Sequence, residues 1–315
     1  MTLTLFAIIS GLVLLCGGAE ILIRGAVSLS LRIGISPLVV GLTVVALGTS
    51  SPEIVVGIKA AIDGHGGIAV GSVVGSNICN IGLILAIGVL VRPISIQVAL
   101  LRRDLPILLG ITLLVPLTMT NGIIGRLEGA LLLGGAIAYI AFNIIQSRKV
   151  KNDAADSEYE HGLPPRRYSP LMTTALIASG IVGLAAGGRL LLHGGVDLAT
   201  RLGVSEAVIG LTIVAFGTSL PELATAITAA RRGHGDIAVG NAIGSNVMNL
   251  LAVLGLAALV TPLHMSEVRP FDLAVMVCMT VVLLPLMRSD YSLKRLEGVL
   301  LLVCYLAYIS YTVMG

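Results

Sequence analysis

The chain has 315 residues, of which 56% are hydrophobic and 12% are charged, and its mean hydropathy is +1.00. This composition excludes an ordinary soluble globular protein, and the small formal charge of +3 gives no reason to expect a nucleic-acid partner. We therefore expect an all-α polytopic membrane protein whose first partner is the lipid bilayer. Continuous apolarity without alternating faces favours helices over a β-barrel, so no strands are expected.

Ten apolar segments are long enough to cross a bilayer, which takes about 17 to 25 helical residues. They cover residues 3–23, 37–62, 67–91, 104–120, 127–146, 170–192, 206–230, 236–260, 271–288 and 296–314. The first segment lacks a basic region and a small-residue cleavage site, so we interpret it as a permanent span. The chain then divides into a first half of five helices at 1–146, a hydrophilic linker at 147–169 and a second half of five helices at 170–315.

The two halves carry a duplication. Residues 41–80 return at 210–249 without a gap, with 24 of 40 positions identical, and 126–129 return at 295–298. Because each half has an odd number of spans, the second half must enter the membrane from the opposite side. The sequence therefore predicts an inverted repeat, an architecture found in many secondary transporters.

The placement of basic residues predicts the orientation. Connectors after the odd-numbered spans hold 15 of the 20 lysines and arginines. The positive-inside rule then places these connectors and the linker in the cytoplasm and both termini outside. We expect a multi-pass protein of the cytoplasmic (plasma) membrane.

Each copy of the duplication sets one glutamate, Glu53 or Glu222, inside an apolar segment. A charged side chain at the membrane centre costs about 2.5 to 3.5 kcal/mol even on lenient scales, so two such acids call for a stabilising cation. A protonated acid hydrogen-bonded between helices is the simpler alternative.

A proline precedes each glutamate and interrupts the helix. Pro52 has no amide hydrogen, so the carbonyl of Gly48 loses its helical partner. Non-helical backbone at membrane depth is tolerated where it lines a cavity or is buried in protein. At helical spacing, an alanine carbonyl, a threonine hydroxyl and the carboxylate share one stripe. These stripes are Ala46, Thr49 and Glu53 in the first half and Ala215, Thr218 and Glu222 in the second.

The next segment of each half carries a Gly-Ser-Asn-x-x-Asn motif, whose serine and second asparagine share a helix face. The two pairs are Ser76 with Asn80 and Ser245 with Asn249. Asn77 and Asn246 lie off that face, and we expect them to be structural. Oxygen ligands suit hard ions such as Ca²⁺, Na⁺ and Mg²⁺, and an irregular cage suits Ca²⁺ better than Mg²⁺. Plain hydrogen bonding between helices is the alternative interpretation of these side chains.

These motifs resemble the paired alpha repeats of the sodium/calcium exchanger family, within the cation/calcium antiporter superfamily. The resemblance rests on residues 48–53 with 75–77 and 217–222 with 244–246, and it extends over essentially the whole chain, in the compact form of prokaryotic members. It implies ten helices, four of them around the ions, and exchange of Ca²⁺ or a similar divalent cation for Na⁺ by alternating access. It implies a calcium site of Thr49, Glu53, Thr218 and Glu222, with the threonines binding through backbone oxygens. It implies sodium or central positions at Ala46, Ser50, Ser76, Asn80, Ala215, Ser219, Ser245 and Asn249.

Two positions depart from the family pattern. Ser51 stands where leucine is usual, and we expect this change to affect packing. Asn249 stands where some relatives, including potassium-dependent ones, have aspartate, so Glu53 and Glu222 are the only matched carboxylates and potassium dependence is not expected. Proton-coupled relatives typically have Gly-Asn in place of Gly-Thr-Ser, so this motif favours Na⁺.

The sequence leaves other functions open. A divalent cation/proton antiporter, in which the two glutamates would take up protons, is the main alternative, and a gated channel is another. An intramembrane hydrolase would need a nucleophile with a base or a metal-bound water, and no such constellation lies in the apolar segments, so no enzyme activity is expected. No phosphate-binding motif is present, so we expect no nucleotide and no cofactor besides the transported ions. The sequence does not predict an oligomeric state.

Overall fold

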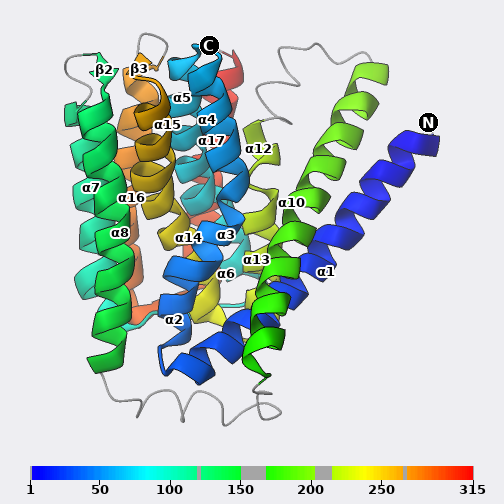
Figure 1. Cartoon of the computed structure of the whole chain (residues 1–315), viewed down its shortest axis with the longest axis vertical. Helices are drawn as coiled ribbons and strands as arrows, with labels where there is room; N and C mark the ends of the chain where they lie inside the picture. Colours follow the sequence, from blue (N-terminus) through cyan, green and yellow to red (C-terminus); the bar gives the residue numbers. More distant parts are fainter. Residues whose placement is uncertain (1, 119–121, 150–167, 203–214, 265–267, 315) are drawn as a thin grey trace.

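The structure is a computed structural model, and it describes residues 2–118, 122–149, 168–202, 215–264 and 268–314. Most helices run along the long axis of the molecule, and both chain termini lie at the same end (Figure 1). We call this the upper end. The lower end is the one where α8 (Arg126–Lys149) finishes and α10 (Pro170–Arg201) begins (Figure 1).

The helices before the linker include three short π-helical turns. They are α1 (Thr2–Ile33), α2 (Pro37–Val40), the π turn η1 (Gly41–Val45), α3 (Ala46–Thr49), α4 (Ser51–Ile62), α5 (Gly66–Cys79), the π turn η2 (Asn80–Leu85), α6 (Ala86–Val91), the π turn η3 (Leu100–Asp104), α7 (Leu105–Thr118) and α8. After the linker come α10, α12 (Ala215–Gly217), α13 (Leu220–Arg231), α14 (Gly235–Met248), the π turn η5 (Asn249–Val253), α15 (Leu254–Val260), α16 (Pro270–Arg288), the 3₁₀ turn η6 (Ser289–Tyr291) and α17 (Arg295–Met314).

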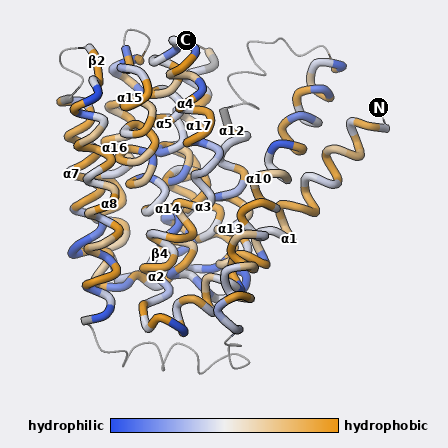
Figure 2. The backbone as a smooth tube through the Cα atoms, viewed as in Figure 1, coloured by the Kyte–Doolittle hydropathy of each residue, from blue (hydrophilic) through white to orange (hydrophobic). Residues whose placement is uncertain are grey.

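The helices have the length and surface of membrane spans. Seven of them in the described residues are long and apolar enough to cross a bilayer, and the pair Pro37–Thr49 and Ser51–Ile62, bent by 46°, would be an eighth. Hydrophobic residues cover most of the length of the outer helices (Figure 2), and large apolar side chains such as Leu131 on α8 are exposed, as lipid contact requires. The prediction of an all-α polytopic membrane protein is thus confirmed.

The expected number of ten spans stays a prediction. The fourth expected span is α7 preceded by η3, and its α-helical part has only 14 residues. The seventh, at 206–230, lies partly outside the described residues.

The predicted ends of two spans are wrong. α1 continues past residue 23 to Ile33, and α10 continues past residue 192 to Arg201. A charged residue does not end the helix here, because Arg24 lies inside α1, where its Nε donates to the Glu20 carboxylate one turn earlier at 2.8 Å. This i, i+4 pair lets the helix continue through the charge.

The expectation of no strands is also wrong. The connectors that the structure describes contain four two-residue strands: β1 (Ile94–Ser95), β2 (Ile123–Ile124), β3 (Leu263–His264) and β4 (Ser292–Leu293). β1 pairs antiparallel with β4, and β2 pairs antiparallel with β3, so each pair joins the first half of the chain to the second. Connector backbone needs hydrogen-bond partners, and these pairings supply them.

α1 and α10 pack against each other so closely that only glycine fits along the seam. A Cβ at Gly18 would lie 2.8 Å from the Leu184 nitrogen, and one at Gly187 would lie 2.7 Å from the Leu15 nitrogen. Contacts that advance along α1 retreat along α10, so the two helices are antiparallel. The seam consists of Gly11, Gly18 and Gly25 on α1 and Gly180, Gly187 and Gly194 on α10.

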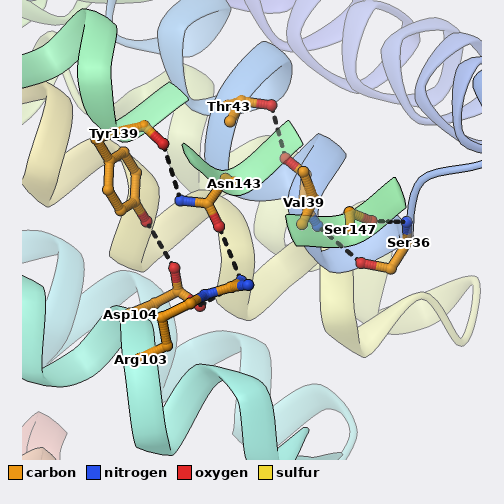
Figure 3. Close-up of polar contacts among 8 residues, drawn as sticks. All are labelled: Ser36, Val39, Thr43, Arg103, Asp104, Tyr139, Asn143 and Ser147. Carbon is orange, nitrogen blue, oxygen red and sulfur yellow. Dashed lines mark hydrogen bonds and ion pairs between the residues drawn. The ribbon is translucent and has the colours of Figure 1, made fainter. Parts of the chain in front are cut away.

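A largely buried polar cluster joins η3, the π turn before α7, to α8 away from the duplicated motif (Figure 3). Arg103 Nη2 lies 3.0 Å from Asp104 Oδ2 and donates to Asn143 Oδ1 at 2.8 Å, and the Tyr139 hydroxyl donates to Asp104 Oδ1 at 3.3 Å. Asp104 has both an ionic partner and a hydroxyl donor, so its burial is compensated within the cluster. No sequence motif predicts this cluster, whose side chains hold η3 against α8.

Candidate functional site

The first Gly-Thr-Ser-x-Pro-Glu motif lies where one helix stops and another begins. α3 ends at Thr49, α4 starts at Ser51, and the bend between them is 46°. Pro52 lies in the first turn of α4, as expected from its missing amide hydrogen. The second motif has the same form, because α12 ends at Gly217 and α13 starts at Leu220 with Pro221 in its first turn.

The break places each glutamate in the first turn of a helix. Glu53 is the acidic residue in the first turn of α4, and Glu222 is its counterpart in α13. The amino end of a helix carries unsatisfied amide groups and a positive partial charge, which favour a negative side chain there. Both carboxylates are buried, with exposed fractions of 2% and 1%. The proline therefore supplies a break that makes burial of an acid less costly.

The carbonyl that the first proline releases is not free. The Ser51 hydroxyl donates to the carbonyl oxygen of Gly48 at 2.8 Å. The hydroxyl of Ser51 replaces the missing amide donor, a role that the sequence did not predict, and the expected effect of Ser51 on packing stays a prediction. Leu220 at the equivalent position has no hydroxyl, so the two breaks differ chemically.

Side chains from the two halves meet around the glutamates. The Ser50 hydroxyl donates to Glu222 Oε1 at 3.2 Å, and the Thr49 and Ser245 hydroxyls also interact with the Glu222 carboxylate. Thr218 interacts with the Glu53 carboxylate, which lies close enough to Glu222 for their charges to interact. Each acid is thus approached by hydroxyl groups of the other half of the chain.

Further hydroxyl contacts complete this region. Ser219 Oγ lies 3.5 Å from Ser76 Oγ, and Thr49 Oγ1 lies 3.5 Å from Ser245 Oγ. The carbonyl of Ala46 accepts from the Ser50 amide at 2.9 Å within the helix. Ala215 begins α12. Of the twelve residues expected here, the threonines, serines and glutamates are therefore brought together by direct contacts.

Four asparagines join α5 to α14. The side-chain amide of Asn77 donates to the Asn246 carbonyl at 3.3 Å, and Asn246 returns the contact to the Asn77 carbonyl at 3.2 Å. Asn80 Nδ2 donates to Asn246 Oδ1 at 2.9 Å, and Asn249 Nδ2 donates to Asn77 Oδ1 at 3.1 Å. The structural role expected for Asn77 and Asn246 is confirmed, and it includes holding Asn80 and Asn249 by their amide nitrogens.

Four buried oxygens of this region, Glu53 Oε2, Glu222 Oε2, Asn80 Oδ1 and Asn249 Oδ1, have no hydrogen-bond partner among the described residues. Buried polar atoms are normally paired, because leaving one unpaired costs about 1 to 3 kcal/mol. The described residues contain no group of three or more His, Cys, Asp or Glu side chains that could hold a metal. A cation bound here would therefore need amide, hydroxyl or backbone oxygens beside the two carboxylates, a donor set that suits hard ions.

Two features of the site were not predicted. Asn241 on α14 is fully buried, and its Oδ1 accepts from the Thr49 hydroxyl at 3.0 Å while its Nδ2 has no partner. The equivalent position in the first half is Ser72, so the repeat comparison gave no signal for this residue. In addition, η2 and η5 begin at Asn80 and Asn249, and single π-helical turns are frequent at functional sites.

α14 reaches the site because glycine lets it touch the first half of the chain. A Cβ at Gly244 would lie 2.4 Å from the carbonyl oxygen of Leu42 in η1, and one at Gly240 would lie 2.7 Å from that of Leu38 in α2. This close approach sets Ser245 and Asn241 beside Thr49.

Comparison with known proteins agrees with these features. A family model described as sodium/calcium exchanger protein matches residues 3–145 and again residues 172–314. The chain is 38% identical over 310 residues to the putative antiporter CaxA of Alkalimonas amylolytica, covering 97% of each protein. It is 37% identical over 288 residues to the inner membrane protein YrbG of Escherichia coli, covering 90% of this chain and 88% of that one. A solved structure of the sodium-calcium exchanger NCX_Mj superposes with a TM-score of 0.85 at 30% identity, covering 98% of both chains.

Proposed function

Because the chain belongs to the sodium/calcium exchanger family, we propose that it moves Ca²⁺, or a similar divalent cation, in exchange for Na⁺ by alternating access. Cation antiport follows from the family, whereas the identity of both ions is our inference. The observation that carries it is the set of four buried oxygens without partners, two from carboxylates and two from amides.

The charge of this set suits exchange. Glu53 and Glu222 together carry two negative charges when ionised, which one divalent ion or two monovalent ions would balance. Either occupant would relieve the repulsion between the carboxylates, and the presence of one would make the other unfavourable. Mutually exclusive occupancy is the electrostatic basis of antiport.

The proposed ligands follow the contacts around each acid. We assign Ca²⁺ to Glu53 and Glu222 with the backbone oxygens of Thr49 and Thr218. Na⁺ would use the same carboxylates with the surrounding hydroxyl and carbonyl groups, and the free amide oxygens of Asn80 and Asn249 would line the centre. The remaining proposed positions for Na⁺ are Ala46, Ser50, Ser76, Ala215, Ser219 and Ser245.

An inverted repeat would give both sides of the membrane access to one site. The antiparallel contact of α1 with α10, the matching motif breaks and the two separate family matches support a duplication with opposite orientation. We propose ten spans, with the α1–α10 pair tilting against the remaining helices to expose the site alternately. By the positive-inside rule, the lower end would face the cytoplasm and both termini would lie outside.

The test of this function is a flux measurement. Proteoliposomes loaded with Na⁺ and diluted into Na⁺-free buffer should accumulate ⁴⁵Ca²⁺, and replacing internal Na⁺ by choline should stop the uptake. Uptake driven by a pH gradient without Na⁺ would instead support a cation/proton antiporter. Ca²⁺ entry that needs no counter-ion would indicate a channel.

Replacing Asn241 by serine, the residue found at the equivalent position 72, should weaken Ca²⁺ binding. The Thr49 hydroxyl would lose its contact with Asn241 Oδ1 at 3.0 Å and keep the longer one to the Ala46 carbonyl at 3.3 Å, and a buried hydrogen bond contributes about 1 kcal/mol, which corresponds to roughly a five-fold rise in the half-saturating Ca²⁺ concentration. The dependence of the uptake rate on Ca²⁺ concentration measures this effect. A lower maximal rate at unchanged half-saturation would contradict it, because purely structural damage reduces the active fraction alone.

A further inference from the structure

A two-point ion pair joins α1 to the end of α13. Arg232, just after α13, places Nη2 2.7 Å from Glu20 Oε1 and donates from Nε to Glu20 Oε2 at 3.0 Å. Arg24 adds a third contact from within α1 at 2.8 Å. Two parallel contacts between a guanidinium and a carboxylate are stronger and more directional than one. The Glu20 side chain remains 25% exposed, so this pair lies at the protein edge, where water can replace either partner.

The offset of the duplication maps this pair onto residues of reversed charge. Glu20 corresponds to Arg189 on α10, and Arg232 corresponds to Asp63 just after α4, each 169 positions away. If only one of the two residues had changed its charge between the halves, the pair would repel. Because both have changed, the second half again has an acid opposite a base. The second half can therefore form an equivalent ion pair with the opposite polarity.

The second ion pair, between Asp63 and Arg189, is not formed in this structure. Neither the Asp63 nor the Arg189 side chain has an ion-pair partner in the part of the chain that the structure describes. The packing has the same asymmetry, because α1 packs along α13 whereas α10 makes little contact with α4. In Figure 1, α1 and α10 lie against the other helices at the lower end and diverge from them toward the upper end.

The contacts between α1 and α10 hold the two helices together, so they would move as one unit. Besides the glycine seam, Ser28 Oγ on α1 lies 2.8 Å from Thr173 Oγ1 on α10, and the Thr4 hydroxyl bonds to Asp197 near the other end of the pair. A tilt that brings Arg189 toward Asp63 would therefore draw Glu20 away from Arg232.

We propose that these are two alternating ionic latches: Glu20 with Arg232 holds the lower end closed, and Asp63 with Arg189 holds the upper end closed in the opposite state. This inference rests on the proposed alternating access and adds the groups that bias it. Partly exposed ion pairs are individually weak, so each latch shifts the ratio of the two states by about 1.4- to five-fold. A latch of this strength favours one state without trapping the protein in it.

Disulfide formation between Asp63→Cys and Arg189→Cys tests the proposal, in the full chain with its four native cysteines replaced by alanine. The free cysteines at 16, 79, 278 and 304 would otherwise compete. We expect the introduced cysteines to cross-link on mild oxidation in membranes, and Glu20→Gln to raise the initial cross-linking rate by about 1.4- to five-fold. Arg232→Gln should have the same effect, and Glu20→Lys combined with Arg232→Glu should return the rate to its starting value.

Asp290→Asn provides the matched control, because it removes an ion pair with Lys294 that lies within one exposed turn. This control should leave the cross-linking rate unchanged. The proposal is wrong if Glu20→Gln and Asp290→Asn give the same cross-linking rate. It is also wrong if none of the protein variants forms the disulfide under any ion condition. The cross-link reports the tilt even when no ion moves, so its result is separate from the flux assay, whose failure would count against the proposed exchange itself.

Discussion

Replacing Glu53 or Glu222 by glutamine should abolish Na⁺-driven Ca²⁺ uptake, with a loss of at least about 100-fold. Glutamine has nearly the same shape, so the substitution removes one negative charge while the surrounding packing is kept. The site would then hold a divalent ion with a single carboxylate, and removing one partner of a buried charge pair costs about 3 to 5 kcal/mol. Initial rates of ⁴⁵Ca²⁺ uptake into Na⁺-loaded proteoliposomes measure the loss.

Glu128→Gln is the control for this experiment. Glu128 lies in the first turn of α8, outside the two Gly-Thr-Ser-x-Pro-Glu motifs, and its substitution should leave uptake within about two-fold of the unmodified protein. Thermal unfolding of all three variants separates lost function from lost folding. Substantial uptake by either motif variant, in folded protein, would show that the second charge is not needed and would overturn the proposed site.

Replacing Gly244 by alanine should lower the free energy of unfolding by more than removing any single contact at the protein surface would. The added Cβ would lie 2.4 Å from the Leu42 carbonyl oxygen and 2.7 Å from two further backbone atoms of that residue, so α14 must shift away from η1. Overpacking of this kind costs about 1 to 3 kcal/mol or more, because backbone cannot rotate aside as a side chain can. The chain has no tryptophan, so thermal unfolding in detergent is best followed by circular dichroism.

Gly134→Ala makes the same chemical change at an open position. Gly134 is exposed on α8, and no described atom lies within 4 Å of a Cβ built there. Its substitution should leave the unfolding midpoint unchanged or slightly raised, since alanine is the better helix former. Equal midpoints for the two variants would mean that α14 and η1 do not approach as closely as described.

Hydropathy and the duplication predict much of this fold, because both act over long stretches of chain. In the described residues, eight of the expected spans, counting the bent pair, overlap helices that are long and apolar enough to cross a membrane. Rules based on neighbouring residues did not predict the helix end at Ile33 or the short strands, because contacts beyond the immediate neighbours determine both. The contact of Arg24 with Glu20 allows α1 to continue, and the strands depend on partners more than 130 residues away.

The candidate site shows the same division. The proline breaks and the buried glutamates follow from the properties of single residues, so the motif alone predicts them. Asn241 and the hydroxyl role of Ser51 depend on which group of another turn or helix is nearby, and the sequence comparison between halves offers serine and leucine at those places. A repeat reveals what the two copies share, whereas these residues act where the copies differ.

The pairing of β1 with β4 and of β2 with β3 also constrains biosynthesis. The strands β1 and β2 leave the ribosome before the linker, but their partners belong to the last part of the polypeptide. A nascent chain that has inserted only its first helices therefore exposes strand edges that nothing can yet cover. Closure of both ends of the bundle must be a late event, completed only after translation has delivered the final hairpin of helices.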